Sequence, residues 1–162
     1  MIYIPVASDE QVKEEVLNSL PESPTIVSSP RIEDHYASIA ANRRKIFELF
    51  LKTDEKYLKM QDRHILHLAP DSFKQAEEFL DEHEDWGAVA LFVGKRLPRP
   101  DKNHVKFDCV VIRREALVDI KLELNGGCDC IAFCREIRKK YRYGYLNKLY
   151  LVTNANIKQR SQ

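Results

Sequence analysis

Asp62 and His64 are the two side chains in this sequence whose types and spacing best suit metal chemistry. They follow the segment Glu55-Lys-Tyr-Leu-Lys-Met-Gln, and an extended chain directs residues i and i+2 to the same side. We therefore expect both to face one side together, with Arg63 directed to the other. A carboxylate oxygen and an imidazole nitrogen suit Mn²⁺ or Mg²⁺ better than a structural zinc, which takes four closed ligands. Two protein ligands would leave coordination positions that a diphosphate can fill. The alternative is a solvated turn after a strand, because Asp-x-His also arises by chance.

Strands and helices alternate in the first half of the sequence. Strands are expected at 2–7, 25–28 and 57–61. One helix is expected to open at Ser8, with Gln11 completing a capping box, and the next to run from Asp34 to about residue 52. Short connections in this order predict a parallel sheet with right-handed crossovers. Ligands bind outside the carboxyl ends of such strands, where residues 5–7, 28–29 and 62–64 all fall.

The second half of the sequence is more mixed. Ser72 and Gln75 predict a capping box at the start of another helix. Further strands are expected at 88–93, 105–112 and 149–153, with a basic connection at 95–104. Helices are expected at 113–120 and, after the glycines at 126–127, at 129–143. No linker or repeat interrupts the chain, so we expect one domain over 1–155 and a polar tail over 156–162.

Composition describes an ordinary α/β domain. The chain has 162 residues, is 44% hydrophobic and 31% charged, and carries a formal net charge of +1. This size supports one core, and the near-neutral charge gives no reason to expect nucleic-acid binding. No segment approaches the roughly 18 apolar residues of a membrane span, and the first residues lack the pattern of a signal peptide. We therefore expect a cytoplasmic protein.

The four cysteines are expected to be buried, reduced thiols. Three of them form a C-x-C-x₃-C pattern, which is not a usual zinc-knuckle spacing. They are Cys109, Cys128, Cys130 and Cys134.

The order of elements resembles the glycosyltransferase A-type fold, in particular the nucleotide-sugar-binding half of the family-2-like enzymes. The resemblance is carried by AANRRKIFELFLKTDEKYLKMQDRH, in which a helix containing Asn and Arg precedes the strand that ends in the DxD motif. That motif reads Asp62-Arg63-His64 here, and a DxH form occurs in some members of the superfamily. The resemblance implies a Rossmann-like mixed, mainly parallel sheet flanked by helices. It also implies that Asp62 and His64 hold Mn²⁺ or Mg²⁺ against the diphosphate of a nucleotide-sugar donor.

The same resemblance implies roles for further residues. A nucleoside would lie beside Pro5 to Ala7, and the second strand would end at a base- or ribose-contacting group. The helix start in NGGCDCIAFCREI would supply a catalytic base for the acceptor hydroxyl. The residues so implied are Pro5, Ala7, Ser28 and Ser29, then Asn42 and Arg43 on the helix that faces the nucleotide, and Asp129 as the base.

Each of these residues also has a purely structural interpretation. Asp129 suits a helix N-cap, and Arg43 could extend its charge to solvent from the edge of its helix. His67, His83 and His104 are expected at the surface.

The leading functional prediction is a metal-dependent glycosyltransferase that acts on an unknown acceptor. The chain is short for that family, which leaves two alternatives open. One is a non-catalytic nucleotide- or protein-binding module on the same fold, and the other is a nucleotidyltransferase. A homo-oligomer could complete the acceptor site.

Overall fold

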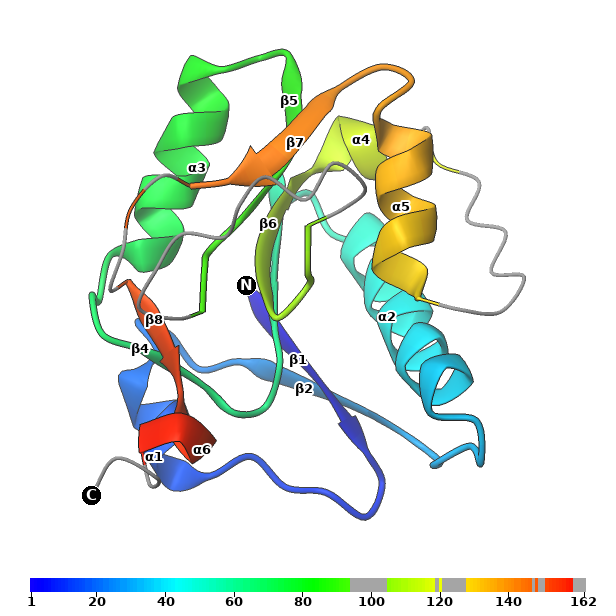
Figure 1. Ribbon diagram of the computed structural model, residues 1–162, viewed down its shortest axis with the longest axis vertical. Coiled ribbons are helices and arrows are strands. Elements are labelled where there is room, and N and C mark those ends of the chain that lie inside the picture. The colour runs from blue at the N-terminus through cyan, green and yellow to red at the C-terminus, as the bar shows by residue number, and fades with distance from the viewer. Residues whose placement is uncertain (94–104, 119, 121–127, 147, 149–150, 159–162) are drawn as a thin grey trace.

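Helices cover both faces of a six-stranded sheet (Figure 1). The computed structural model describes residues 1–93, 105–118, 120, 128–146, 148 and 151–158. Across the sheet the strand order is β2-β1-β3-β6-β5-β7. In that order the strands are β2 (Thr25–Ser29), β1 (Ile2–Ala7), β3 (Tyr57–Gln61), β6 (Cys109–Arg113), β5 (Trp86–Ala90) and β7 (Arg142–Tyr145).

One strand of this sheet runs against the others. Strand β1 is parallel to β2 and β3, and β5 is parallel to β7, whereas β6 is antiparallel to both of its neighbours, β3 and β5. The predicted mixed, mainly parallel sheet is therefore confirmed. Because β1, β2 and β3 share one direction, their carboxyl ends lie at the same edge, which is where the candidate site is found.

The larger helices are divided between the two faces. Helices α2 (His35–Leu51), α4 (Arg114–Val118) and α5 (Asp129–Ile137) lie on one face, and α3 (Ser72–Glu82) lies on the other (Figure 1). A second sheet, of β4 (Ile65–His67) and β8 (Val152–Asn154), lies near α1 (Glu14–Ser19) and α6 (Ala155–Lys158).

Strand β6 shows how the sheet is buried on both sides. Val110 and Ile112 belong to the core beneath α2 and α5, and Cys109 and Val111 belong to the core beneath α3. All four side chains are fully buried. Continuous apolar strands of this kind are typical of sheets covered on both faces.

Two consecutive arginines, the last residue of β6 and the first of α4, hold one helix on each face. The Arg113 guanidinium donates hydrogen bonds to carbonyls at and just after the C-terminal end of α3, those of Leu80, His83 and Trp86. The Arg114 guanidinium donates to carbonyls at and just after the end of α2, those of Leu51, Thr53 and Glu55. A helix leaves its last carbonyls without intrahelical partners, so both side chains stabilise helix ends that anchor to the sheet.

Both predicted capping boxes are wrong. Helix α1 begins at Glu14, and the backbone N–H of Ser8 instead donates to the Ser29 carbonyl at 2.9 Å. Helix α3 begins at Ser72 itself, whose hydroxyl is bonded to the buried ring of His67 and so does not cap the helix. His67 is therefore a core residue rather than a surface one. The predicted start of α2 is confirmed, because the Asp34 side chain accepts from the Ala37 N–H at 2.9 Å.

The expected helix over 129–143 ends at Ile137, and residues 142–145 form an edge strand, β7. There Gly144 passes so close to the Trp86 ring that a Cβ would lie 2.9 Å from it. The strands expected at 88–93, 105–112 and 149–153 are shifted or shorter, with β5 beginning at Trp86, β6 at Cys109 and β8 at Val152. The connection at 95–104, with His104, and the glycines at 126–127 lie outside the described residues. Within the described part of the chain, no helix is long and apolar enough to cross a membrane.

Candidate functional site

A cavity of about 260 Å³ opens at the shared edge of the sheet. Its walls come from the end of β1, the loops that follow β1, β2 and β3, and one side of α2. The lining residues are Pro5, Val6, Ala7 and Glu10, then Arg31, then His35, Ser38, Ile39 and Asn42, and finally Asp62, Arg63 and His64. Five of the predicted site residues, namely Pro5, Ala7, Asn42, Asp62 and His64, are thus brought together here.

The Asp62–His64 segment reaches the cavity as a turn and not as an extended strand end. The N–H of Ile65 donates to the Asp62 carbonyl at 3.2 Å, which closes the turn. The N–H of Asp62 is held by the Asp108 carbonyl at 2.9 Å. Because the chain turns, the alternation of an extended segment does not apply. The expected extended geometry is therefore wrong, and Arg63 lines the same cavity as Asp62 and His64.

The protonation of Asp62 and His64 suits a cation between them. Burial raises the pKa of Asp62 to about 6; Arg43 opposes this rise, while Asp108 adds to it. Burial, with the charge of Arg63, lowers the pKa of His64, so its ring is neutral at neutral pH and keeps a free nitrogen lone pair. A buried carboxylate that is costly to ionise gains from a nearby cation. The donor set, one oxygen and one nitrogen, therefore fits Mn²⁺ or Mg²⁺.

Arg43 lies behind the cavity and joins two carboxylates. It is 6% exposed, so it does not reach solvent from the helix edge. Its Nη1 lies 2.7 Å from the Asp129 Oδ1, its Nη2 lies 3.6 Å from the Asp62 Oδ1, and its guanidinium stacks over the Phe107 ring. Its Nε is buried without a hydrogen-bond partner among the described residues.

Asp129 is the first helical residue of α5, and Cys128 occupies the N-cap position. The interpretation of Asp129 as the N-cap is therefore wrong. The carboxylate of Asp129 is instead turned to Arg43, and the residue is 8% exposed. It does not line the cavity, although Arg43 connects it to Asp62, which does.

Asn42 ties three elements together at the cavity wall. Its Nδ2 donates to the Val6 carbonyl of β1 at 3.2 Å, and its Oδ1 accepts from the hydroxyl of Ser29 at the end of β2. Ser29 and Ser28 do not line the cavity themselves. Ser28 is exposed, and its carbonyl accepts from the Lys45 ammonium at 2.9 Å.

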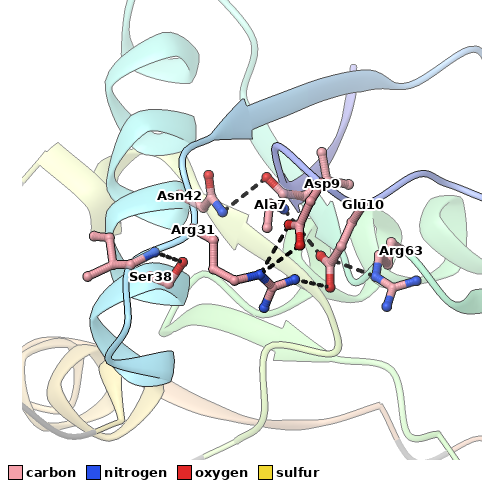
Figure 2. A network of polar contacts seen from close by, with 9 residues as sticks. Ala7, Asp9, Glu10, Arg31, Ser38, Asn42 and Arg63 are labelled. Atoms are coloured by element: carbon pink, nitrogen blue, oxygen red, sulfur yellow. Dashed lines mark hydrogen bonds and ion pairs between the residues drawn. The ribbon is translucent and has the colours of Figure 1, made fainter.

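Several lining residues were not anticipated from the sequence, and four of them are charged or titratable: Glu10, Arg31, His35 and Arg63. Glu10 and Arg31 follow the ends of β1 and β2 just as Asp62 follows β3. The same position after a strand could therefore have identified them. Figure 2 shows that Glu10 lies between Arg31 and Arg63, with its carboxylate directed to both.

A different group of metal-ligand types does not fit a metal. Among the residues that the structure describes, Cys128, Asp129 and Cys130 form the one group of three such side chains close enough to share an ion. Burial and a hydrogen bond with Cys128 raise the pKa of Cys130 to about 12, and Asp129 is engaged by Arg43. A protonated thiol is a poor ligand. None of the four cysteines forms a disulfide bond, and all but Cys128 are buried.

Comparison with solved structures identifies the fold. No protein-family model matches the chain, and no curated protein sequence does. The crystal structure of A197 from STIV matches with a TM-score of 0.65 at 17% identity, over 88% of this chain and 80% of that one. The mannosyltransferase PcManGT from Pyrobaculum calidifontis, in complex with GDP-Man and Mn²⁺, also matches with a TM-score of 0.65, at 13% identity. The chain has the glycosyltransferase A-type fold.

Further glycosyltransferases share this fold. Glucosyl-3-phosphoglycerate synthase from Mycobacterium tuberculosis, in complex with Mg²⁺ and uridine diphosphate, matches with a TM-score of 0.56 at 11% identity, over 90% of this chain and 68% of that one. The match to the mannosyltransferase covers 95% of this chain and 56% of the enzyme. The chain thus spans little more than half the length of that enzyme. The expected glycosyltransferase A-type fold is confirmed.

Proposed function

We propose that the protein transfers a sugar from a nucleoside-diphosphate donor to an acceptor hydroxyl with the help of a divalent metal ion. The observation that carries this proposal is the cavity at the ends of β1, β2 and β3, which Asp62 and His64 both line. Structural neighbours of the same fold hold GDP-Man with Mn²⁺ and uridine diphosphate with Mg²⁺. Both neighbour complexes therefore contain the ligand classes that this cavity would take.

The residues of the cavity would divide the task between them. Main-chain groups of Pro5 to Ala7 would border the nucleoside, and Asn42 would hold that wall in place through its bond to the Val6 carbonyl. Asp62 and His64 would hold Mn²⁺ or Mg²⁺, which acts as a Lewis acid that neutralises the departing diphosphate. Holding the donor in a fixed orientation removes much of the entropic cost of the reaction.

Asp129 is proposed as the base that accepts the proton of the acceptor hydroxyl, which would make the reaction inverting. Its position supports this role in one respect: Arg43 holds it on the same guanidinium that approaches Asp62. An acceptor would have to reach Asp129 from the side of the cavity at which Arg43 lies. Ser29 would act indirectly, because its hydroxyl donates a hydrogen bond to Asn42 at the cavity wall.

A second candidate is a non-catalytic nucleotide-binding module on the same fold. The observation that favours it is the confinement of Asp129, which is buried, paired with Arg43 and absent from the cavity lining. Such a module would bind the nucleotide and the metal ion but would not turn over a donor.

A thermal-shift panel tests the proposal. UDP, GDP, CDP and ADP are each measured with and without Mn²⁺ on wild type, on Asp62→Ala and on the matched control Asp54→Ala, which removes an exposed aspartate. A ligand at 100 times its dissociation constant stabilises a protein by about 2.7 kcal/mol, which is a shift of several degrees for a domain of this size. We expect a Mn²⁺-dependent shift with one nucleotide in wild type and in Asp54→Ala, and none in Asp62→Ala.

Turnover assays then separate the candidate functions. Release of the nucleoside diphosphate from a nucleotide sugar supports the transferase, and binding without release supports the module. A preference for nucleoside triphosphates would instead indicate a nucleotidyltransferase. A nucleotide shift that persists in Asp62→Ala would contradict the proposed metal site.

A further inference from the structure

Glu10 occupies the space between two arginines that come from different loops. Its Oε1 lies 3.1 Å from Nη2 of Arg31, and its Oε2 lies 3.3 Å from Nε of Arg63 (Figure 2). The Oε2 atom also accepts a hydrogen bond from the N–H of Ala7, at 3.2 Å. One carboxylate thus satisfies donors from the ends of β1, β2 and β3, and all three charged side chains line the cavity.

The two guanidiniums are open to a ligand from the cavity. The Arg31 side chain is 49% exposed and that of Arg63 is 36% exposed, whereas Glu10 between them is 27% exposed. Arg31 has a second carboxylate partner, since its Nε lies 3.1 and 3.0 Å from the two oxygens of Asp9. Asp9 does not line the cavity. It would therefore keep Arg31 in position if Glu10 moved away.

Glu10 is held as an anion in this position. Burial raises its pKa, but the Ala7 N–H and the guanidiniums of Arg31 and Arg63 outweigh this effect, so the pKa of Glu10 lies below its ordinary value. A guanidinium binds phosphate oxygens through paired, charge-assisted hydrogen bonds. A diphosphate offers more negative charge and more acceptor oxygens than a single carboxylate does.

We propose that Arg31 and Arg63 form the phosphate-binding site of this cavity, and that Glu10 is an internal competitor that leaves them when a nucleoside diphosphate binds. The proposal rests on the proposed function for the identity of the ligand. In the ligand-free protein Glu10 neutralises the two arginines and ties the loop after β1 to the loops after β2 and β3. Binding would release that loop, so entry of the ligand and movement of residues 8–13 would be coupled.

The test compares Glu10→Gln with Asp9→Asn, which neutralises the other carboxylate on Arg31. Isothermal titration measures the affinity for inorganic pyrophosphate and for the nucleoside diphosphate that gives the largest thermal shift, both with Mn²⁺. Glutamine keeps the size of Glu10 but competes less well for two guanidiniums. We expect Glu10→Gln to bind both probes about 3- to 10-fold more tightly, an effect of the size expected when one competing charged contact is weakened. Asp9→Asn should bind no more tightly than wild type, because Arg31 loses the group that positions it.

Two further variants, Arg31→Gln and Arg63→Gln, test the site itself and should each weaken binding about tenfold or more, as for loss of one charge-assisted contact. Circular dichroism and thermal midpoints establish that each variant is folded.

Weaker binding by Glu10→Gln, or unchanged binding, would show that Glu10 does not compete, and wild-type affinity in both arginine variants would exclude the phosphate site. The proposed function would survive either result if Asp62→Ala still abolished binding. Failure of wild type and Glu10→Gln to bind either probe would overturn both proposals.

Discussion

Arg43 and Asp129 form a buried ion pair across 86 positions of the sequence, with 2.7 Å between Nη1 and Oδ1. The pair joins the middle of α2 to the first turn of α5, and the other terminal nitrogen of Arg43 approaches Asp62 at 3.6 Å. One guanidinium therefore holds both the candidate base and a candidate metal ligand. Arg43 is thus an internal counter-charge for two acidic groups and does not extend to solvent.

Loss of this counter-charge should be costly. Arg43→Met leaves Asp129 and Asp62 without their cation, and removal of one partner from a buried pair typically costs about 3–5 kcal/mol. Urea unfolding at pH 7 measures the change in the free energy of unfolding. Arg44→Met is the control, because the neighbouring arginine is exposed on the other side of α2 and should lose little. A loss below about 1 kcal/mol for Arg43→Met, the size typical of an exposed ion pair, would show that the pair adds nothing to stability.

Asp62→Asn should stabilise the ligand-free protein at neutral pH. Burial raises the pKa of Asp62 to about 6, above its ordinary value of 3.8, so the charged form is disfavoured by folding. The cost is fully present above pH 6, shrinks as the pH falls, and is nearly absent below pH 4. A neutral, isosteric amide avoids it, with a gain on the order of 3 kcal/mol at pH 7.5.

Chemical denaturation of wild type and Asp62→Asn at pH 7.5 and pH 4 checks both the sign and the window. The stabilisation should be large at the first pH and small at the second. If Asp62 holds a metal ion, the variant should also lose the Mn²⁺-dependent thermal shift. A variant less stable than wild type at pH 7.5 would show that the contact with Arg43 outweighs the cost of burial.

The early strands and α2 could be predicted because their signals are local. Apolar runs of the right length mark β1, β2 and β3, and the Asp34 cap marks the start of α2. Their direction then follows from short connections, and the edge that holds the site follows from their direction. The convergence of residues 5–7 with 62–64 at one cavity was therefore accessible from the sequence.

Features that depend on distant partners were not accessible. The short, partly exposed run 142–145 becomes a strand only because β5 offers it an edge. Ser72 matches a capping box in sequence, but a buried imidazole takes its hydroxyl. The position of Glu10 and Arg31 after strand ends makes them candidates for the cavity lining, but no local pattern shows that the loops bring Arg31 and Arg63 within 3.3 Å of Glu10. In each case the deciding contact joins segments whose proximity no local pattern records.

His67 links the small sheet to the turn that carries Asp62 and His64. Its Nε2 lies 2.5 Å from the Gln61 Oε1, and its Nδ1 is bonded to the Ser72 hydroxyl. The Gln61 amide nitrogen in turn donates to the Ile65 carbonyl at 3.0 Å, which steadies the turn. A neutral ring can donate to the amide oxygen and accept from the hydroxyl, whereas a protonated ring can only donate.

Acid should therefore destabilise the protein through His67. Burial lowers the pKa of His67 from 6.5 to about 4, so its contribution to stability is complete above pH 6.5 and is lost as the pH falls toward 4. The shift corresponds to a loss on the order of 3 kcal/mol across that window. His67→Gln cannot be protonated, and its free energy of unfolding should fall less steeply between pH 7 and pH 4.5 than that of wild type.

Urea titrations at pH 7, 5.5 and 4.5 give the two slopes, with His35→Gln at the exposed start of α2 as a control for loss of a histidine. Parallel pH profiles for wild type and His67→Gln would contradict the assignment, because the acid sensitivity would then arise from other groups.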